Sequence, residues 1–171
     1  GFNAGAADMT SAADGTVAVG HSALAALTSG ARNLAIGFQT LQHTVTGTDN
    51  IAIGHNVMSD LDVAGNNAND SDHNIGIGSN SMSGTWTNAK SEANIAIGSN
   101  TLDGNMAGAN YNIALGYTAL SAITSGKANI GIGGYAGAAT TTAVNNIAIG
   151  TNDDTSLGAL QTNTVGSYCI A

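Results

Sequence analysis

The segment Asn50-Ile51-Ala52-Ile53-Gly54 decides the fold, because the chain repeats it in near-identical form along most of its length. The same order of asparagine, aliphatic, small, aliphatic and glycine residues ends at Gly37, Gly78, Gly98, Gly116, Gly133 and Gly150. A variant, Thr16-Val17-Ala18-Val19-Gly20, precedes them. Each copy of such a repeat forms one structural unit that stacks on the next. The sequence therefore predicts a solenoid.

The spacing of the motif glycines defines the unit. From Gly20 to Gly150 the successive spacings are 17, 17, 24, 20, 18, 17 and 17 residues, so the unit has 17 residues and the three long coils are consecutive. Aliphatic residues that alternate with small ones have the period of a β-strand. We therefore predict an all-β protein, a parallel β-roll or β-solenoid of about 17-residue coils.

This pattern divides the chain into three parts. Residues 1–15 are predicted to be a degenerate N-terminal cap coil, in which Asn3-Ala4-Gly5 lies 15 residues before Gly20. Residues 16–155 form the repeat region, with insertions at 59–73, 83–93 and 103–111. Residues 156–171 are predicted to be a C-terminal cap or a junction. Terminal repeats are commonly atypical, because they must cover the ends of the stack.

Within one unit, we predict that Leu34 and Ile36 point into the coil and that Ala35 lies on the opposite face. Leu41 follows Ile36 by an odd number of residues, so simple alternation would place the two side chains on opposite faces. A turn at Gly37 would bring Leu41 inside as well, and we predict a second short strand after this turn. The small middle residues of the eight strands would then form a flat outer face. We predict that copies of the chain pack against one another through this face.

The asparagine that begins each strand is predicted to stack on its equivalents and to form a hydrogen-bonded ladder. Asparagine also tolerates turn conformations, and both explanations are compatible with the pattern. The ladder residues are Asn33, Asn50, Asn74, Asn94, Asn112, Asn129 and Asn146, and the turn glycines are Gly20, Gly37, Gly54, Gly78, Gly98, Gly116, Gly133 and Gly150.

The charge balance excludes some partners. Three basic and 11 acidic residues give a net charge of −8, which disfavours nucleic acid because its binding requires phosphate neutralisation. The chain contains no run of 18 apolar residues, so membrane insertion is not expected. The single cysteine, Cys169, leaves no internal disulfide. We found no catalytic constellation and no phosphate-binding loop, so neither enzymatic activity nor a cofactor is expected.

The three insertions fall in consecutive coils, so their loops should project side by side and form a recognition surface. A tryptophan beside polar groups suits stacking on a sugar. Asp70 and Asp72, like Asp60 and Asp62, could supply oxygen ligands to Ca²⁺, but the calcium-binding nonapeptide of other β-rolls is absent, so no metal is expected. The alternative is that these loops are tolerated surface insertions. The candidate ligand-binding residues are Trp86, Tyr111, Asp60, Asp62, Asp70, Asp72 and Lys90.

The repeats resemble the YadA-like head repeat of trimeric autotransporter adhesins, and GYTALSAITSG (116–126) and GFQTL (37–41) look like repeats of bacteriophage tail fibres. The resemblance covers roughly residues 16–155. It implies a left-handed, homotrimeric β-roll on a virion surface or in the extracellular space. The implied function is a structural fibre or adhesin module that attaches to a host-cell surface glycan or protein receptor.

Two other functions remain open at this stage. Richness in threonine, alanine and asparagine is compatible with an ice-binding β-solenoid, which would require a regular threonine array on one face. Some phage β-solenoids cleave polysaccharides, which requires acidic residues on a strand face. Here the acidic residues are concentrated in the insertions.

Overall fold

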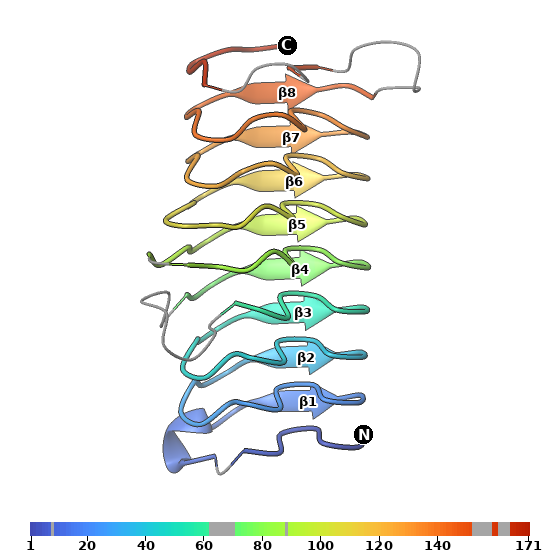
Figure 1. Ribbon diagram of the computed structural model, residues 1–171, viewed down its shortest axis with the longest axis vertical. Helices are drawn as coiled ribbons and strands as arrows, with labels where there is room; N and C mark the ends of the chain where they lie inside the picture. The colour runs from blue at the N-terminus through green and yellow to red at the C-terminus, as the bar shows by residue number, and fades with distance from the viewer. Residues whose placement is uncertain (8, 62–70, 88, 152–158, 161–164) are drawn as a thin grey trace.

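The computed structural model describes residues 1–171 apart from 8, 62–70, 88, 152–158 and 161–164. In this part the chain forms a rod in which eight three-residue strands lie one above the other (Figure 1). The strands are β1 (Val17–Val19), β2 (Leu34–Ile36), β3 (Ile51–Ile53), β4 (Ile75–Ile77), β5 (Ile95–Ile97), β6 (Ile113–Leu115), β7 (Ile130–Ile132) and β8 (Ile147–Ile149). One short 3-10 helix, η1 (Ser11–Ala13), precedes them.

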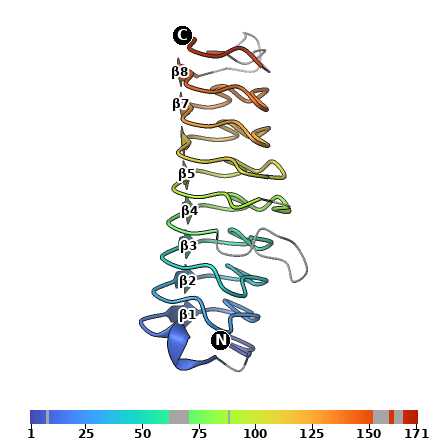
Figure 2. The same ribbon diagram turned by 90° about the vertical axis from the view of Figure 1, so that its left-hand side faces the viewer.

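All eight strands belong to a single parallel sheet in chain order, which confirms the predicted all-β solenoid. Figure 2 shows this sheet along one side of the rod, with the turns of each coil on the other side. Equivalent residues pair throughout: Ala35 is opposite Ala52, and Ala52 is opposite Gly76 across the 24-residue coil. The insertions therefore leave the strand register unchanged. The left-handed winding stays a prediction.

The prediction for the two faces of the strands was wrong. The middle residue of the strand points into the coil, where Ala35, Ala52 and Ala96 are fully buried. The flanking aliphatic residues point outward, with Val17 at 46% and Ile97 at 42% exposed.

The interior is too narrow for larger side chains at the middle position of a strand. At Gly76, even an added Cβ would lie 2.7 Å from Val57 Cγ1 and 2.8 Å from Met58 Cε. A methyl group or a hydrogen is therefore all that most middle positions can hold, because close-packed interiors have no spare volume.

The core is instead filled from the turn after the motif glycine. Leu41 and its equivalents Leu24, Met58, Met82, Leu102 and Leu120 are buried, as the sequence predicted. These residues adopt positive φ angles, for example 49° at Leu41, and so do residues two positions after the glycine, such as Gln39 at 54°. The chain thus turns twice here, and the predicted second strand is absent from the described residues.

The asparagine ladder is confirmed. The backbone N–H of Asn50 donates to Asn33 Oδ1 at 3.0 Å, and the same bond recurs at every later rung. Each side-chain amide also donates to a carbonyl oxygen of the next coil, as from Asn112 to Gly126 at 2.9 Å. All seven asparagines are buried. The ladder therefore satisfies backbone groups that would otherwise be unpaired inside the rod.

Both ends of the chain follow the coil register. Gly1, and not Gly5, takes the motif-glycine position, because a Cβ added at Gly1 would clash with the backbone of Gly20, as a Cβ added at Gly20 would clash with that of Gly37. At the other end, the Cys169 N–H donates to Asn146 Oδ1 at 2.9 Å, which is the bond that an asparagine makes at the earlier rungs. Ile170 pairs in parallel with Ile147.

Candidate functional site

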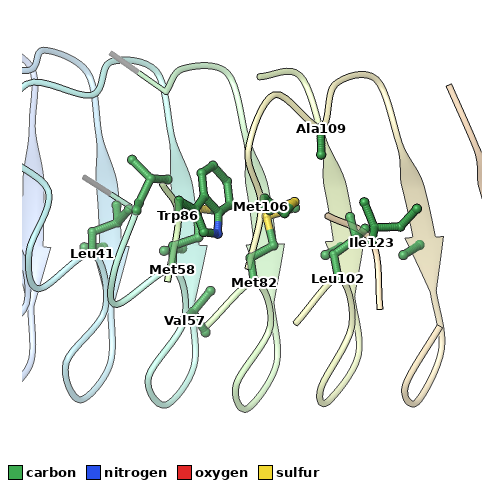
Figure 3. Packing of buried hydrophobic residues seen from close by; sticks show 14 of the residues in the cluster. Leu41, Val57, Met58, Met82, Trp86, Leu102, Met106, Ala109 and Ile123 are labelled. Carbon is green, nitrogen blue, oxygen red and sulfur yellow. The ribbon is translucent and has the colours of Figure 1, made fainter. Parts of the chain in front are cut away.

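The predicted sugar-stacking residue, Trp86, lies in the core and not on the surface. Its side chain is fully buried, and Figure 3 shows it beside Met58 and Met106. Its indole Nε1 has no hydrogen-bond partner among the described residues. The prediction that Trp86 contacts a ligand was therefore wrong, and its role is to fill the enlarged coil.

Position within the coil explains this result. Leu27, Leu61 and Ile123 lie seven residues after their motif glycines and fill the interior at that point. In two of the long coils the equivalent space is filled by Trp86 and Met106, which lie eight residues after theirs. A coil that gains residues encloses more volume, and a larger side chain fills it without leaving a cavity. The insertions thus extend the core as well as the surface.

Two of the predicted polar residues, Asp72 and Lys90, do come together. Lys90 Nζ lies 3.0 Å from Asp72 Oδ2 and 3.0 Å from Glu92 Oε2, and it bridges two adjacent coils. Hydrogen bonds to Glu92 and then Asp72 raise the pKa of Lys90 above its usual value. Asp72 Oδ1 also accepts a hydrogen bond from the Thr48 N–H at 2.7 Å. We call Asp72, Lys90 and Glu92 the charged corner.

The other predicted ligands are not part of the charged corner. Asp60 accepts hydrogen bonds from Thr85 Oγ1 at 3.4 Å and pairs with His43 Nδ1 at 2.6 Å. Asp62 and Asp70 lie outside the described residues. No group of three potential metal ligands occurs in the part of the chain that the structure describes. The described residues also enclose no pocket.

A continuous apolar surface, which the sequence pattern did not predict on this side, runs along the sheet. The outward residues of the eight strands form one uncharged stripe, which we call the aliphatic face. It is about 34 Å long and about 10 Å wide, from the usual spacing of strands and residues. Its residues are Val17, Val19, Leu34, Ile36, Ile51, Ile53, Ile75, Ile77, Ile95, Ile97, Ile113, Leu115, Ile130, Ile132, Ile147 and Ile149.

Two rows of side chains border the aliphatic face. The leading edge holds the residue before each ladder asparagine, including Arg32, Asp49 and Tyr111. The trailing edge holds the residue after each motif glycine, including Phe38 and His55. The rings at the trailing positions, including Phe38 and His55, are exposed.

Both rows are ordered along the rod. On the trailing edge, the rings of Phe2, His21, Phe38 and His55 stack with centroids 5.0 to 5.6 Å apart. On the leading edge, Arg32 Nε donates to Asp49 Oδ1 at 2.6 Å, and this bond lowers the pKa of Asp49. Because ring faces on the trailing edge cover one another, mainly the ring edges are free to contact a partner.

Comparisons with protein-family models, with curated proteins and with solved structures gave no match. No described helix is long and apolar enough to cross a membrane. The surfaces of the rod are therefore the features that bear on its function.

Proposed function

We propose that this chain is a rod-shaped structural module of a surface fibre, on a virion or in the extracellular space. In this proposal the module is built by lateral association of three copies. The observation that supports it is the aliphatic face, which runs the full height of the sheet and is uncovered by any described part of the chain. Fibres require rigid, elongated units, and a stack of hydrogen-bonded coils provides one.

The size and chemistry of the aliphatic face favour a second copy as its partner. Monomeric soluble proteins rarely expose contiguous apolar patches of more than a few hundred Å². The flat outline alone covers roughly 340 Å² at the spacings of a β-sheet, and the accessible area of its side chains is larger. A straight apolar stripe is self-complementary to another straight stripe of the same length. Three copies facing a common axis would remove all three stripes from water.

The charged corner lies outside the aliphatic face, and the Lys90 side chain is 42% exposed while that of Asp72 is 15% exposed. Polar side chains on a rigid scaffold are suited to recognition. Attachment to a host-surface glycan or protein receptor through this corner stays a prediction. The ice-binding alternative gains no support, since Thr40, Thr44 and Thr101 are buried.

Size-exclusion chromatography with light scattering tests the self-association. We expect a single species of about three times the 16.7 kDa chain mass at micromolar concentration. Raising the salt concentration should leave this mass unchanged, because burial of apolar surface is not screened as exposed ion pairs are. A monodisperse species of 16.7 kDa would contradict the proposed function.

A further inference from the structure

The row of stacked rings on the trailing edge ends at His55, and the next ring in this row is Tyr117. The two coils between them carry serines at the same position, Ser79 and Ser99. Phe38 covers one face of the His55 ring at a centroid distance of 5.4 Å, and no described ring covers the other face. The Tyr117 side chain is 51% exposed. We call the space over the two serines, between the two rings, the ring gap.

The turns that carry the ring gap stay stacked in spite of the insertions. The Asn80 N–H donates to the His55 carbonyl oxygen at 2.9 Å, and the equivalent bond recurs in the next two coils. Figure 1 shows these turns one above the other beyond the strand arrowheads. Three steps of about 4.8 Å separate the His55 and Tyr117 rings by roughly 14 Å along the rod. Stacked rings in this chain lie 5.0 to 5.6 Å apart, so one planar ring could not stack on both walls.

Polar groups without partners line the ring gap. The hydroxyl groups of Ser79, Ser99 and Tyr117 make no hydrogen bond within the described part of the chain. Beside the serines, Asn80 Nδ2 donates to Asn100 Oδ1 at 3.4 Å, and the Asn100 amide nitrogen has no described acceptor. Ser79 is exposed, and Ser99, Asn80 and Asn100 are half-buried. The gap thus offers hydroxyl and amide groups, and none of these four side chains carries a charge.

This combination of groups suits a neutral sugar. A sugar ring has an apolar face of C–H groups, which packs on an aromatic ring, and hydroxyl groups at its edge, which bond to hydroxyls and amides. A carboxylate or sulfate group on the sugar would lose its water without gaining a cationic partner from the serines and asparagines of the gap. The height of the gap requires a molecule with more than one ring.

We infer that the ring gap binds a neutral oligosaccharide of at least two sugars, which lies along the rod. One sugar stacks on the free face of His55, and another lies against Tyr117. The hydroxyl groups of the two serines and the amide of Asn100 bond to the sugar hydroxyls. The inference goes beyond the proposed function, because one chain forms the whole site and no association of copies is needed. The site is also separate from the charged corner.

Two variants close or open the ring gap. Ser79→Phe adds a ring over the free face of His55, as Phe38 covers the other face, and so fills the gap. The fold should accept this ring, because Ser79 is exposed and the same position two coils earlier holds Phe38. Tyr117→Ala removes the opposite wall. Tyr111→Ala is the matched control, because this tyrosine is 59% exposed but lies on the leading edge.

The probe is an array of short oligosaccharides of defined structure, with neutral, sialylated and sulfated members. The unmodified chain should retain neutral members of two or more sugars. Titration with a retained oligosaccharide, followed by NMR, should show affinity at least about tenfold weaker for Ser79→Phe and Tyr117→Ala, because each removes a stacking surface. Tyr111→Ala should keep the original affinity. Circular dichroism should show that all three variants are folded.

Retention of charged oligosaccharides only, or of none, would overturn the inference. Equal affinity of the unmodified chain and the folded Ser79→Phe variant for a neutral oligosaccharide would overturn it as well. Light scattering on the same samples tests the proposed function separately. A trimer that retains no sugar would leave the proposed function standing, and a monomer that retains a neutral oligosaccharide in the ring gap would leave only the sugar site standing.

Discussion

Replacing Gly116 with alanine is expected to destabilise the fold strongly. Gly116 has a φ angle of +125°, which side chains rarely adopt, and a Cβ at this position would lie 2.7 Å from the carbonyl carbon and oxygen of Gly133. The strained backbone costs about 1–3 kcal/mol. The clash adds to this cost, because the carbonyl group of Gly133 is held in the next coil and cannot move away from the new methyl group. We expect a total loss of about 4 kcal/mol or more, measured by urea unfolding followed by circular dichroism.

Gly134 provides the matched control one coil further along. An added Cβ at Gly134 would have only the Tyr117 carbonyl oxygen nearby, at 4.0 Å, and the φ angle lies outside the left-handed region. Gly134→Ala should therefore leave the unfolding midpoint almost unchanged. If Gly116→Ala were as stable as this control, the close stacking of successive glycine turns would be wrong.

Replacing Asn112 with aspartate should destabilise the protein by about 4 kcal/mol at neutral pH, because it places an unpaired charge in the interior. The carboxylate would keep the role of acceptor from the Asn129 N–H at 3.1 Å. It could not replace the two bonds that the amide donates, to Gly126 O at 2.9 Å and Asn94 Oδ1 at 3.0 Å. A carboxylate oxygen of the variant would then face the acceptor oxygens of Gly126 and Asn94 with no hydrogen between them. Thermal and urea unfolding would measure the loss.

The Asn112→Asp variant should regain stability in acid. Burial among acceptor oxygens raises the pKa of the introduced carboxyl in the folded state above its unfolded value of about 3.9. The penalty is complete above the folded pKa, shrinks as the pH falls between the two values, and disappears below the unfolded one. Asn145→Asp, at an exposed position, is the control. Equal stability of the two variants at neutral pH would show that the ladder contributes little.

The repeat period predicted much of the fold from sequence. Asparagine recurs before seven of the eight strands because its amide both donates and accepts, so a single residue type can bond to its own copies above and below. Leu41 and its equivalents were correctly placed inside, since an odd step from the strand requires a turn. These predictions depended only on the alignment of equivalent positions, which the 17-residue spacing supplies.

The side of the strand that faces inward could not be obtained from the same pattern. Alternation of isoleucine and alanine indicates two different faces, but the assignment depends on how much room the rest of the coil leaves. That room is occupied by Leu41 or Met58 from the turn, which only the three-dimensional arrangement reveals. Two aliphatic residues flanking an alanine or a glycine in every strand were the available signal for an apolar outer face.

The same limitation applied to Trp86. Its place in an insertion suggested a surface loop, whereas counting from Gly78 puts it one residue beyond the position at which Leu27 and Ile123 fill the core. Asp72 and Lys90 were correctly grouped, because residues in consecutive long coils share a corner. Glu92 completes that group, and its position two residues before a ladder asparagine, as for Asp72, was the signal that could have found it.

A comparison of Ala52→Asp with Ile53→Asp tests the central claim most directly, because the two residues are adjacent in β3 and point to opposite sides. We predict that Ala52→Asp abolishes the β-sheet signal in circular dichroism, because it buries a charge inside the coil. Ile53→Asp should retain that signal, and its mass by light scattering should fall towards 16.7 kDa as the copies separate. A folded Ala52→Asp variant together with an unfolded Ile53→Asp variant would contradict the outward orientation of the aliphatic face.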